Sequence, residues 1–195
     1  MAKSPPSGVY APLPAFFNDA DELGKRRSIP GSHLQRINRP VDVKSFVQHG
    51  LFVAKPGVIP VVSATMGEAA HLDREERIQL IQALRAALNK HDLHETPIVA
   101  GVGATSTRET IRLAQGAAAA GAEFVLVIAP GYFSSALKAD PAAIRRFFTD
   151  VAAQSPVPVI IYNFPVVAGG IDLTSDDVVE IAKAAPNLKP TYELG

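Results

Sequence analysis

Polar residues that could carry chemistry follow three apolar segments of this sequence. Residues 63–68 come after the first segment, Tyr132 after the second, and Tyr162 with Asn163 after the third. A threonine, Thr65, and two tyrosines in such places could form a hydroxyl relay, because a phenol passes on a proton when its neighbours donate and accept in turn. The alternative is that the tyrosines only pack and hydrogen-bond at the edge of the fold.

The apolar segments have the length and composition of strands that are buried on both faces. They are rich in β-branched residues and alternate with helical patterns, which predicts a parallel sheet made of βαβ units. The predicted strands are 8–12, 58–63, 97–101, 124–129 and 158–162. Helix starts are predicted at Asp73 with Glu76, at Ser106 with Glu109, at Asp140 before Pro141 and at Thr174 with Asp177. The charged run 73–77 is expected to form a solvated first turn.

Two segments interrupt this alternation. Residues 24–41 are polar and aperiodic, which predicts an inserted loop before a helix that begins near Val43. Residues 187–195 stand where a sixth strand is due, but Pro190 lacks the N–H that a central strand needs. We therefore expect a single domain over 1–195 with five βα units, in which 187–195 is a tail outside the pattern.

Composition excludes several classes of function. The 195 residues are 47% hydrophobic, which suffices for one core, and 19 basic residues balance 19 acidic ones without a nucleic-acid footprint. A small neutral or acidic metabolite is therefore the expected partner. Cysteine is absent, the five histidines form no convincing ligand set, and no apolar run has membrane-spanning length. We expect a cytoplasmic protein without a metal, a cofactor or a membrane partner.

Strand and helix alternation fits either a doubly wound sheet or a (β/α)8 barrel. A doubly wound nucleotide-binding fold would need a glycine fingerprint after its first strand. The nearest candidate, Gly101 and Gly103 with Ser106, follows the third strand, and no acidic residue closes the next one. A tight turn into a helix explains these residues better. A nucleotide-binding enzyme remains the weaker alternative to a barrel, whose active site would lie at the carboxyl ends of the strands.

Five blocks of the sequence resemble the dihydrodipicolinate synthase and N-acetylneuraminate lyase family in order and spacing. The blocks are GVYAPLPAFF at 8–17, ATMGEAAHLDREER at 64–77, PIVAGVGATSTRETI at 97–111, VLVIAPGYF at 125–133 and VIIYNFP at 159–165. The resemblance implies a partial (β/α)8 barrel that is not closed, made of the first five βα units. It also implies a class I aldolase, in which a lysine on the sixth strand forms a Schiff base with pyruvate or another 2-oxo acid.

The same resemblance implies roles for individual residues. Tyr162 matches the tyrosine of the YN motif, which moves the proton as the carbon–carbon bond forms or breaks. Thr65 and Tyr132 complete the relay, and Tyr132 would reach across a dimer interface, so a homo-oligomer is expected for a complete form. Thr65 and Gly67 would bind the substrate carboxylate through backbone donors. Met66 stands beside that carboxylate, where the family usually has a hydroxyl or an amide.

Two departures from the family pattern bear on function. The loop after the YN motif carries Val166 and Val167 where dihydrodipicolinate synthases have an arginine. This argues against dihydrodipicolinate synthesis and favours aldolases of 4-hydroxy-2-oxo acids or 2-keto-3-deoxy sugar acids. An ungapped extension of the match places Tyr192 at the position of the Schiff-base lysine, with Lys189 three residues earlier. The alternative is therefore an inactive fragment that only associates with itself or with a full-length paralogue.

Overall fold

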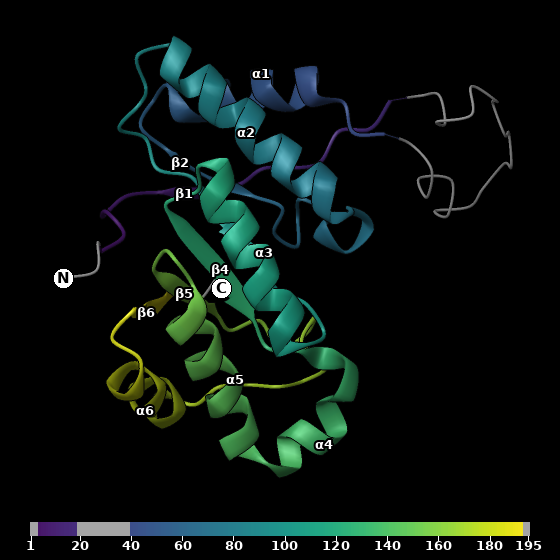
Figure 1. Cartoon of the computed structure of the whole chain (residues 1–195), viewed down its shortest axis with the longest axis vertical. Coiled ribbons are helices and arrows are strands. Elements are labelled where there is room, and N and C mark those ends of the chain that lie inside the picture. Colours follow the sequence, from purple (N-terminus) through teal and green to yellow (C-terminus); the bar gives the residue numbers. More distant parts are fainter. Residues whose placement is uncertain (1–3, 19–39, 193–195) are drawn as a thin grey trace, which may run out of the picture.

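The computed structural model describes residues 4–18 and 40–192 (Figure 1). Its centre is a parallel sheet with the strand order β1-β2-β3-β4-β5-β6, so each strand pairs with its neighbours in the sequence. The strands are β1 (Tyr10–Pro12), β2 (Ile59–Val62), β3 (Val99–Gly101), β4 (Phe124–Ile128), β5 (Val159–Tyr162) and β6 (Leu188–Tyr192). The α-helices are α1 (Val43–Ala54), α2 (Arg74–Lys90), α3 (Thr107–Ala120), α4 (Ser134–Ala139), α5 (Pro141–Gln154) and α6 (Ser175–Ala184). Two short 3-10 helices, η2 (Ala69–His71) and η3 (Gly131–Phe133), follow β2 and β4.

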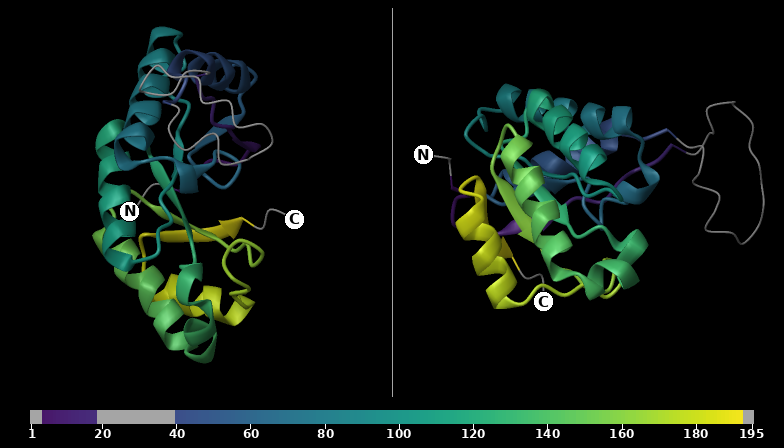
Figure 2. Two further views of the ribbon diagram at one scale, coloured as in Figure 1. Left: turned by 90° about the vertical axis from the view of Figure 1, so that its right-hand side faces the viewer. Right: turned by 60° about the horizontal axis from the view of Figure 1, so that its bottom comes forward.

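The sheet is an open part of a barrel. Strands β1 and β6 each pair with one neighbour only among the described residues, so the sheet does not close on itself. The helices lie along its outer side (Figure 2). A parallel sheet with helices between successive strands and an unclosed edge confirms the predicted partial (β/α)8 barrel.

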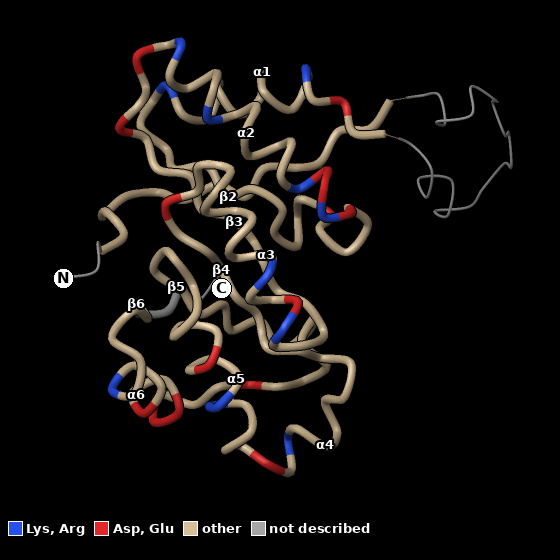
Figure 3. The backbone as a smooth tube through the Cα atoms, viewed as in Figure 1, with Lys and Arg blue, Asp and Glu red and all other residues tan. Residues whose placement is uncertain are grey.

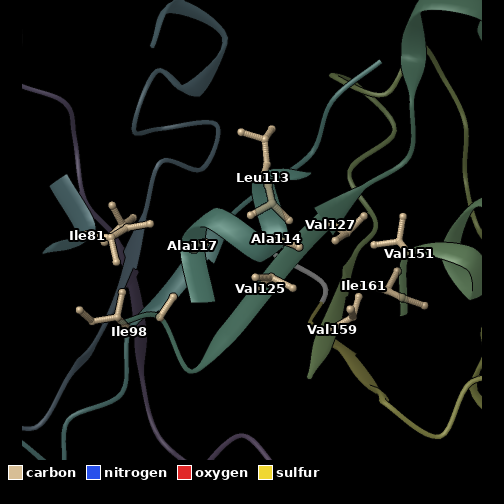
Figure 4. Close-up of a cluster of buried hydrophobic side chains, with 14 of the residues drawn as sticks. Ile81, Ile98, Leu113, Ala114, Ala117, Val125, Val127, Val151, Val159 and Ile161 are labelled. Atoms are coloured by element: carbon tan, nitrogen blue, oxygen red, sulfur yellow. The ribbon is translucent and has the colours of Figure 1, made fainter. Parts of the chain in front are cut away.

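Alternating strand residues supply two separate apolar clusters, because successive side chains in a strand point to opposite faces. Val62, Ala100 and Ile161 belong to the cluster between the sheet and the helices. Figure 4 shows part of this cluster, in which helix residues such as Ala114 lie against Val125 and Val127 of β4. The other cluster lies on the inner face and contains Ile59, Val61, Val99, Phe124, Leu126, Ile160 and Tyr162. The inner face therefore combines an apolar floor with the tyrosine predicted to be catalytic.

The predicted helix starts are confirmed by their capping hydrogen bonds. Asp73 and Glu76 form a reciprocal capping box at α2, and Thr174 and Asp177 form another at α6. Ser106 caps α3, and Asp140 caps α5 ahead of Pro141. These local bonds satisfy backbone donors at the first turn and fix where each helix begins.

The sixth strand corrects the prediction that the sequence after the fifth helix contains none. Residues 188–192 pair in parallel with β5, and the register shifts between Ile160 and Tyr162. Pro190 is compatible with this strand because β6 lies at an edge of the described sheet, where proline is tolerated. The described residues thus form a sheet of six strands where five were expected.

Most of the predicted insertion 24–41 lies outside the described residues. Of this range only Pro40 and Val41 are described, and Val41 is buried in the core. Phe17 and Val41 form an antiparallel bridge, and the Asn18 N–H donates to the Pro40 carbonyl at 3.0 Å. The two ends of the undescribed stretch therefore lie next to each other.

Charged residues are placed on the helices and connecting segments. Strands β1–β5 contain none, so the charges mark the outer elements (Figure 3). Within residues 4–18 and 40–192, no helix combines the length and apolar character needed to cross a membrane.

Candidate active site

The turn after β2 carries the first group of predicted site residues. Ser63 and Glu68 both have left-handed backbones, with φ of 53° and 52°, and bracket the turn. The Glu68 N–H donates to the Thr65 carbonyl at 3.1 Å, and the Ala69 N–H donates to the Ala64 carbonyl at 3.3 Å. These bonds reverse the chain at the carboxyl end of β2. Two non-glycine residues in this sparsely populated conformation mark a strained turn, a feature concentrated at functional sites.

Close packing against neighbouring strand ends holds this turn in place. A Cβ atom at Gly101, the last residue of β3, would lie 2.2 Å from the Ser63 carbonyl oxygen. A Cβ atom at Gly67 would lie 2.9 Å from the Leu13 carbonyl oxygen. Only glycine leaves room for these backbone segments to approach. The turn is therefore fixed from both sides by the ends of β1 and β3.

The turn contains three consecutive backbone donors that could bind a ligand. Within the part of the chain that the structure describes, the N–H groups of Thr65, Met66 and Gly67 have no hydrogen-bond partner. Thr65 and Met66 are exposed, and the Met66 side chain is 67% accessible. Adjacent free N–H groups in a turn with left-handed residues can form a concave site for an anion. This arrangement suits the predicted contact with a carboxylate.

Thr65 and Tyr162 line the same cavity, of about 350 Å³, at the carboxyl ends of the strands. The other polar groups on its wall are Ser63, Glu68, His71 and Arg77. The Ser63 hydroxyl is buried and finds no hydrogen-bond partner among the residues that the structure describes. The sheet thus brings together two of the predicted site residues, although 97 positions separate them in the sequence.

A second cavity, of about 330 Å³, extends from this site over the inner face of the sheet. Val61, Val99, Leu126 and Ile160 form its floor, and Thr65, Met66 and Tyr162 line it as well. Tyr162 is 7% exposed, and its ring centroid lies 5.7 Å from that of Phe164. Tyr162 and Thr65 therefore stand at the boundary between an apolar interior and a polar rim. A phenol in such a place is shielded from bulk water yet can reach a polar substrate.

Tyr132 does not line the cavities that Thr65 and Tyr162 share. It belongs to η3, is 77% exposed, and lines neither cavity. Its ring packs edge-on against Phe133, with centroids 4.9 Å apart. The structure of one chain therefore does not bring Tyr132 to Tyr162, and its role in the relay stays a prediction.

The asparagine of the YN motif has a structural role. Its side-chain oxygen accepts from the Leu173 N–H at 3.1 Å, and its Nδ2 donates to Asp172 at 2.8 Å. Asn163 thus ties the loop after β5 back to the residues that precede α6. Val166 and Val167 lie in this loop, are exposed, and provide no charged group to the site.

Arg77 is a residue of the site region that the sequence prediction misassigned to a solvated first turn. It is half-buried, it lines the same cavity as Thr65, and its Nη2 donates to the Ala69 carbonyl. Desolvation by burial lowers the pKa of its guanidinium. Its spacing from Ile81, Leu84 and Leu88 places it on the apolar face of α2, which the sequence does indicate.

Comparisons with known proteins identify the family. The dihydrodipicolinate synthetase family model matches residues 42–190, which is most of the chain. The chain belongs to the dihydrodipicolinate synthetase family. A curated relative in Emericella nidulans, named "Probable 4-hydroxy-2-oxoglutarate aldolase, mitochondrial", is 42% identical over 93% of this chain and 52% of its own length. An L-threo-3-deoxy-hexylosonate aldolase of Aspergillus niger is 35% identical over 94% of this chain and 50% of its own length.

Solved structures of the family have the same fold. A family protein from Coccidioides immitis superimposes with a TM-score of 0.77 at 36% identity, covering 98% of this chain and 53% of that chain. A prophage protein of the family from Escherichia coli K12, solved in complex with pyruvate, gives 0.73 at 28% identity, covering 95% and 55%. The chain therefore spans about half the length of the family members that it matches. Its relatives are 2-oxo acid aldolases and synthases of the family by name.

Proposed function

We propose that this chain forms the carboxylate-binding and proton-transfer part of a 2-oxo acid aldolase site. The observation that carries the proposal is the cavity shared by Thr65 and Tyr162, next to the three unpaired amides of the turn after β2. The amides of Thr65 and Gly67 would hold the carboxylate of pyruvate or a related 2-oxo acid. Tyr162 would act as the acid and base at the carbon–carbon bond.

The expected substrates are 4-hydroxy-2-oxo acids or 2-keto-3-deoxy sugar acids. The names of the two fungal relatives support this class, and both describe aldolases. The loop with Val166 and Val167 supports it too, because the chain has no arginine there to hold the second carboxylate of a dihydrodipicolinate precursor. Met66 adds an apolar side chain at the mouth of the inner cavity rather than a hydrogen bond.

Turnover requires an amine that this chain is not expected to supply. The family resemblance implies a Schiff base on a lysine of the sixth strand, and an ungapped extension of that match would put Tyr192 at the corresponding position. We therefore propose that the chain binds the 2-oxo acid but does not catalyse the aldol step by itself. The aldolase names of the relatives favour this site-based function over a chain that serves only for association.

Assembly and location belong to the same proposal. Tyr132 is exposed on the rim, which suits a residue that reaches a neighbouring subunit's site, so we expect a homo-oligomer for a complete form. A cytoplasmic location remains the prediction from the sequence, while the Emericella relative is named as mitochondrial.

The test is a titration of the ¹⁵N-labelled chain with pyruvate, followed by amide NMR. Shifts that saturate at Thr65, Met66 and Gly67, and that are lost in a Gly67→Ala variant, are the expected result. A matched Gly116→Ala variant on the outer helix α3 should bind as the parent does. If pyruvate leaves the amides of the turn unmoved, the chain does not hold a 2-oxo acid there and the proposal fails.

A further inference from the structure

Arg77, near the start of α2, has an unusual set of contacts for a partly buried charged residue. Its Nη2 donates to the carbonyl of Ala69, in the segment that continues the turn after β2. Its Nε and Nη1 atoms are buried and have no hydrogen-bond partner in the described part of the chain. A buried charged group normally has all its donors satisfied, since desolvation is costly. The two guanidinium nitrogens without a described partner therefore need a structural or functional explanation.

Within residues 4–18 and 40–192, no carboxylate neutralises Arg77 by contact. Among the described residues no acidic side chain lies within ion-pair distance of it. Glu109 acts on its pKa only through space, and the Glu109 carboxylate lies 3.9 Å from Arg112 instead. The positive charge is thus held in a poorly solvated place beside the cavity, where its field is weakly screened.

Arg85, two turns further along α2, is a useful comparison because its contacts are those of a structural arginine. Its Nη2 lies 2.9 Å from a carboxylate oxygen of Glu123 and donates to the Thr96 carbonyl at 2.8 Å. Its side chain is 14% exposed, so it too is largely removed from water. Arg85 is therefore a partly buried arginine whose charge is neutralised by contact, whereas Arg77 is a partly buried arginine with no contacting carboxylate among the described residues.

We propose that Arg77 is a positioning residue for the carboxylate-binding turn. It fixes the Ala69 carbonyl, and with it the end of the turn, and its unneutralised charge favours an anionic ligand on the amides of Thr65, Met66 and Gly67. The inference rests on the proposed function, because it assigns a second element to the same carboxylate site. A bound carboxylate then supplies the contacting negative charge that no described side chain provides to Arg77.

The test compares a charged ligand with a neutral one of the same shape. Dissociation constants for pyruvate and for pyruvamide are measured by amide NMR on the full chain and on Arg77→Gln, Arg77→Lys and Arg85→Gln. Glutamine keeps a donor for the Ala69 carbonyl and removes the charge, while lysine keeps the charge. We expect Arg77→Gln to weaken pyruvate binding about tenfold and pyruvamide binding by less than about threefold. Arg77→Lys should hold pyruvate within about threefold of the parent, and Arg85→Gln should leave both affinities nearly unchanged.

Other results overturn the inference. If Arg77→Gln lowers the affinities for pyruvate and pyruvamide by the same factor, Arg77 has a structural role only. The same conclusion follows if Arg85→Gln lowers pyruvate affinity as much as Arg77→Gln does. If Arg77→Gln does not fold, Arg77→Lys decides, and a tenfold loss of pyruvate affinity there contradicts the role of the charge. Propionate separates this inference from the proposed function. If propionate binds as tightly as pyruvate and its affinity depends on Arg77, the anion site is supported and specificity for a 2-oxo acid is refuted. If neither ligand binds, both the proposed function and this inference are refuted.

Discussion

Tyr162 pairs with Tyr192 across the parallel strands β5 and β6, whereas Lys189 pairs with Ile160. The backbone of Lys189 is therefore two β5 positions away from the site tyrosine, toward the amino-terminal end of the sheet. That offset is roughly 7 Å along a strand. The carboxyl-terminal rim, where Thr65 and Tyr162 line one cavity, has no described lysine on its wall.

The first prediction is that the chain forms no specific Schiff base with pyruvate. Incubation with pyruvate and borohydride, followed by peptide mass spectrometry, should give no stoichiometric, saturable adduct on Lys189 or on another lysine. The comparison is a hybrid in which the carboxyl-terminal half of the Emericella relative continues the chain after Asn187, with a lysine at position 192. The hybrid should be labelled. A saturable adduct on the parent chain would show that it has a Schiff-base lysine of its own, and the prediction would be wrong.

The second prediction concerns Tyr162 as acid and base. In the same hybrid, Tyr162→Phe should lower kcat for aldol cleavage by about a hundredfold or more, because a positioned proton donor and acceptor is removed. KM should change much less. Tyr10→Phe is the matched control, since Tyr10 also lines the inner cavity but its hydroxyl donates to the Pro6 carbonyl at 2.6 Å. Activity of Tyr162→Phe within about twofold of the parent would remove Tyr162 from this role.

The third prediction tests the close approach of β2 and β3. Gly101→Ala would place a Cβ 2.2 Å from the Ser63 carbonyl oxygen, so the backbone of the turn must move. We expect a loss of about 3 kcal/mol in the free energy of unfolding, measured in urea. Gly116 lies inside helix α3, and in Gly116→Ala the new Cβ meets only the flexible end of the Ile78 side chain, at 3.3 Å. That variant should be neutral or up to about 1 kcal/mol more stable. Similar effects at the two positions would show that the turn is not held by Gly101.

The fourth prediction concerns the pH dependence of the α6 cap. The Thr174 hydroxyl donates to Asp177 at 2.7 Å, and this bond and the Arg145 guanidinium hold the pKa of Asp177 below its usual range. A lowered carboxyl pKa stabilises the fold above the unfolded value of about 3.9, and this stabilisation is lost as the pH falls through the folded value. Thr174→Ala should therefore cost about 1 kcal/mol in unfolding free energy at pH 7 and less at pH 2.5.

Thr149→Ala in α5 is the control for this pH effect. The Thr149 hydroxyl donates to the Arg146 carbonyl at 3.0 Å and has no carboxylate as a hydrogen-bond partner among the described residues, so its effect should not vary with pH. Urea titrations at the two pH values measure both variants. A Thr174→Ala cost that is the same at pH 7 and pH 2.5 would contradict the assignment of the shift to this bond.

The fifth prediction is that residues 19–39 can be replaced by a two-residue Asn-Gly turn. The Asn18 N–H bonds to the Pro40 carbonyl and Phe17 bridges Val41 in an antiparallel manner, so the two ends lie where a tight turn can join them. Val41 is buried and is kept. The shortened chain should retain its melting temperature within a few degrees and its solubility. A cooperative loss of folding would show that the removed residues belong to the core of the fold.

Local sequence determined the elements of this protein. Buried strands such as 124–128 carry continuous apolar residues, and capping pairs such as Thr174 with Asp177 satisfy backbone donors within one turn. Both effects act between near neighbours, so the sequence alone predicts them. The order of βα units and the family motifs then predicted a partial barrel, together with Thr65 and Tyr162 at the ends of its strands.

Tertiary structure decided what depends on contacts between distant residues. Strand β6 forms because its backbone pairs with the edge of β5, although Pro190 lowers the strand propensity of residues 188–192. Tyr132 lines neither cavity that contains Tyr162, because the chain around η3 leaves its ring exposed. Arg77 is half-buried although it stands in a charged run, because helix periodicity places it on the apolar face of α2. Burial and neutralisation of a charge are set by the groups packed around it, and only the folded chain brings those groups together.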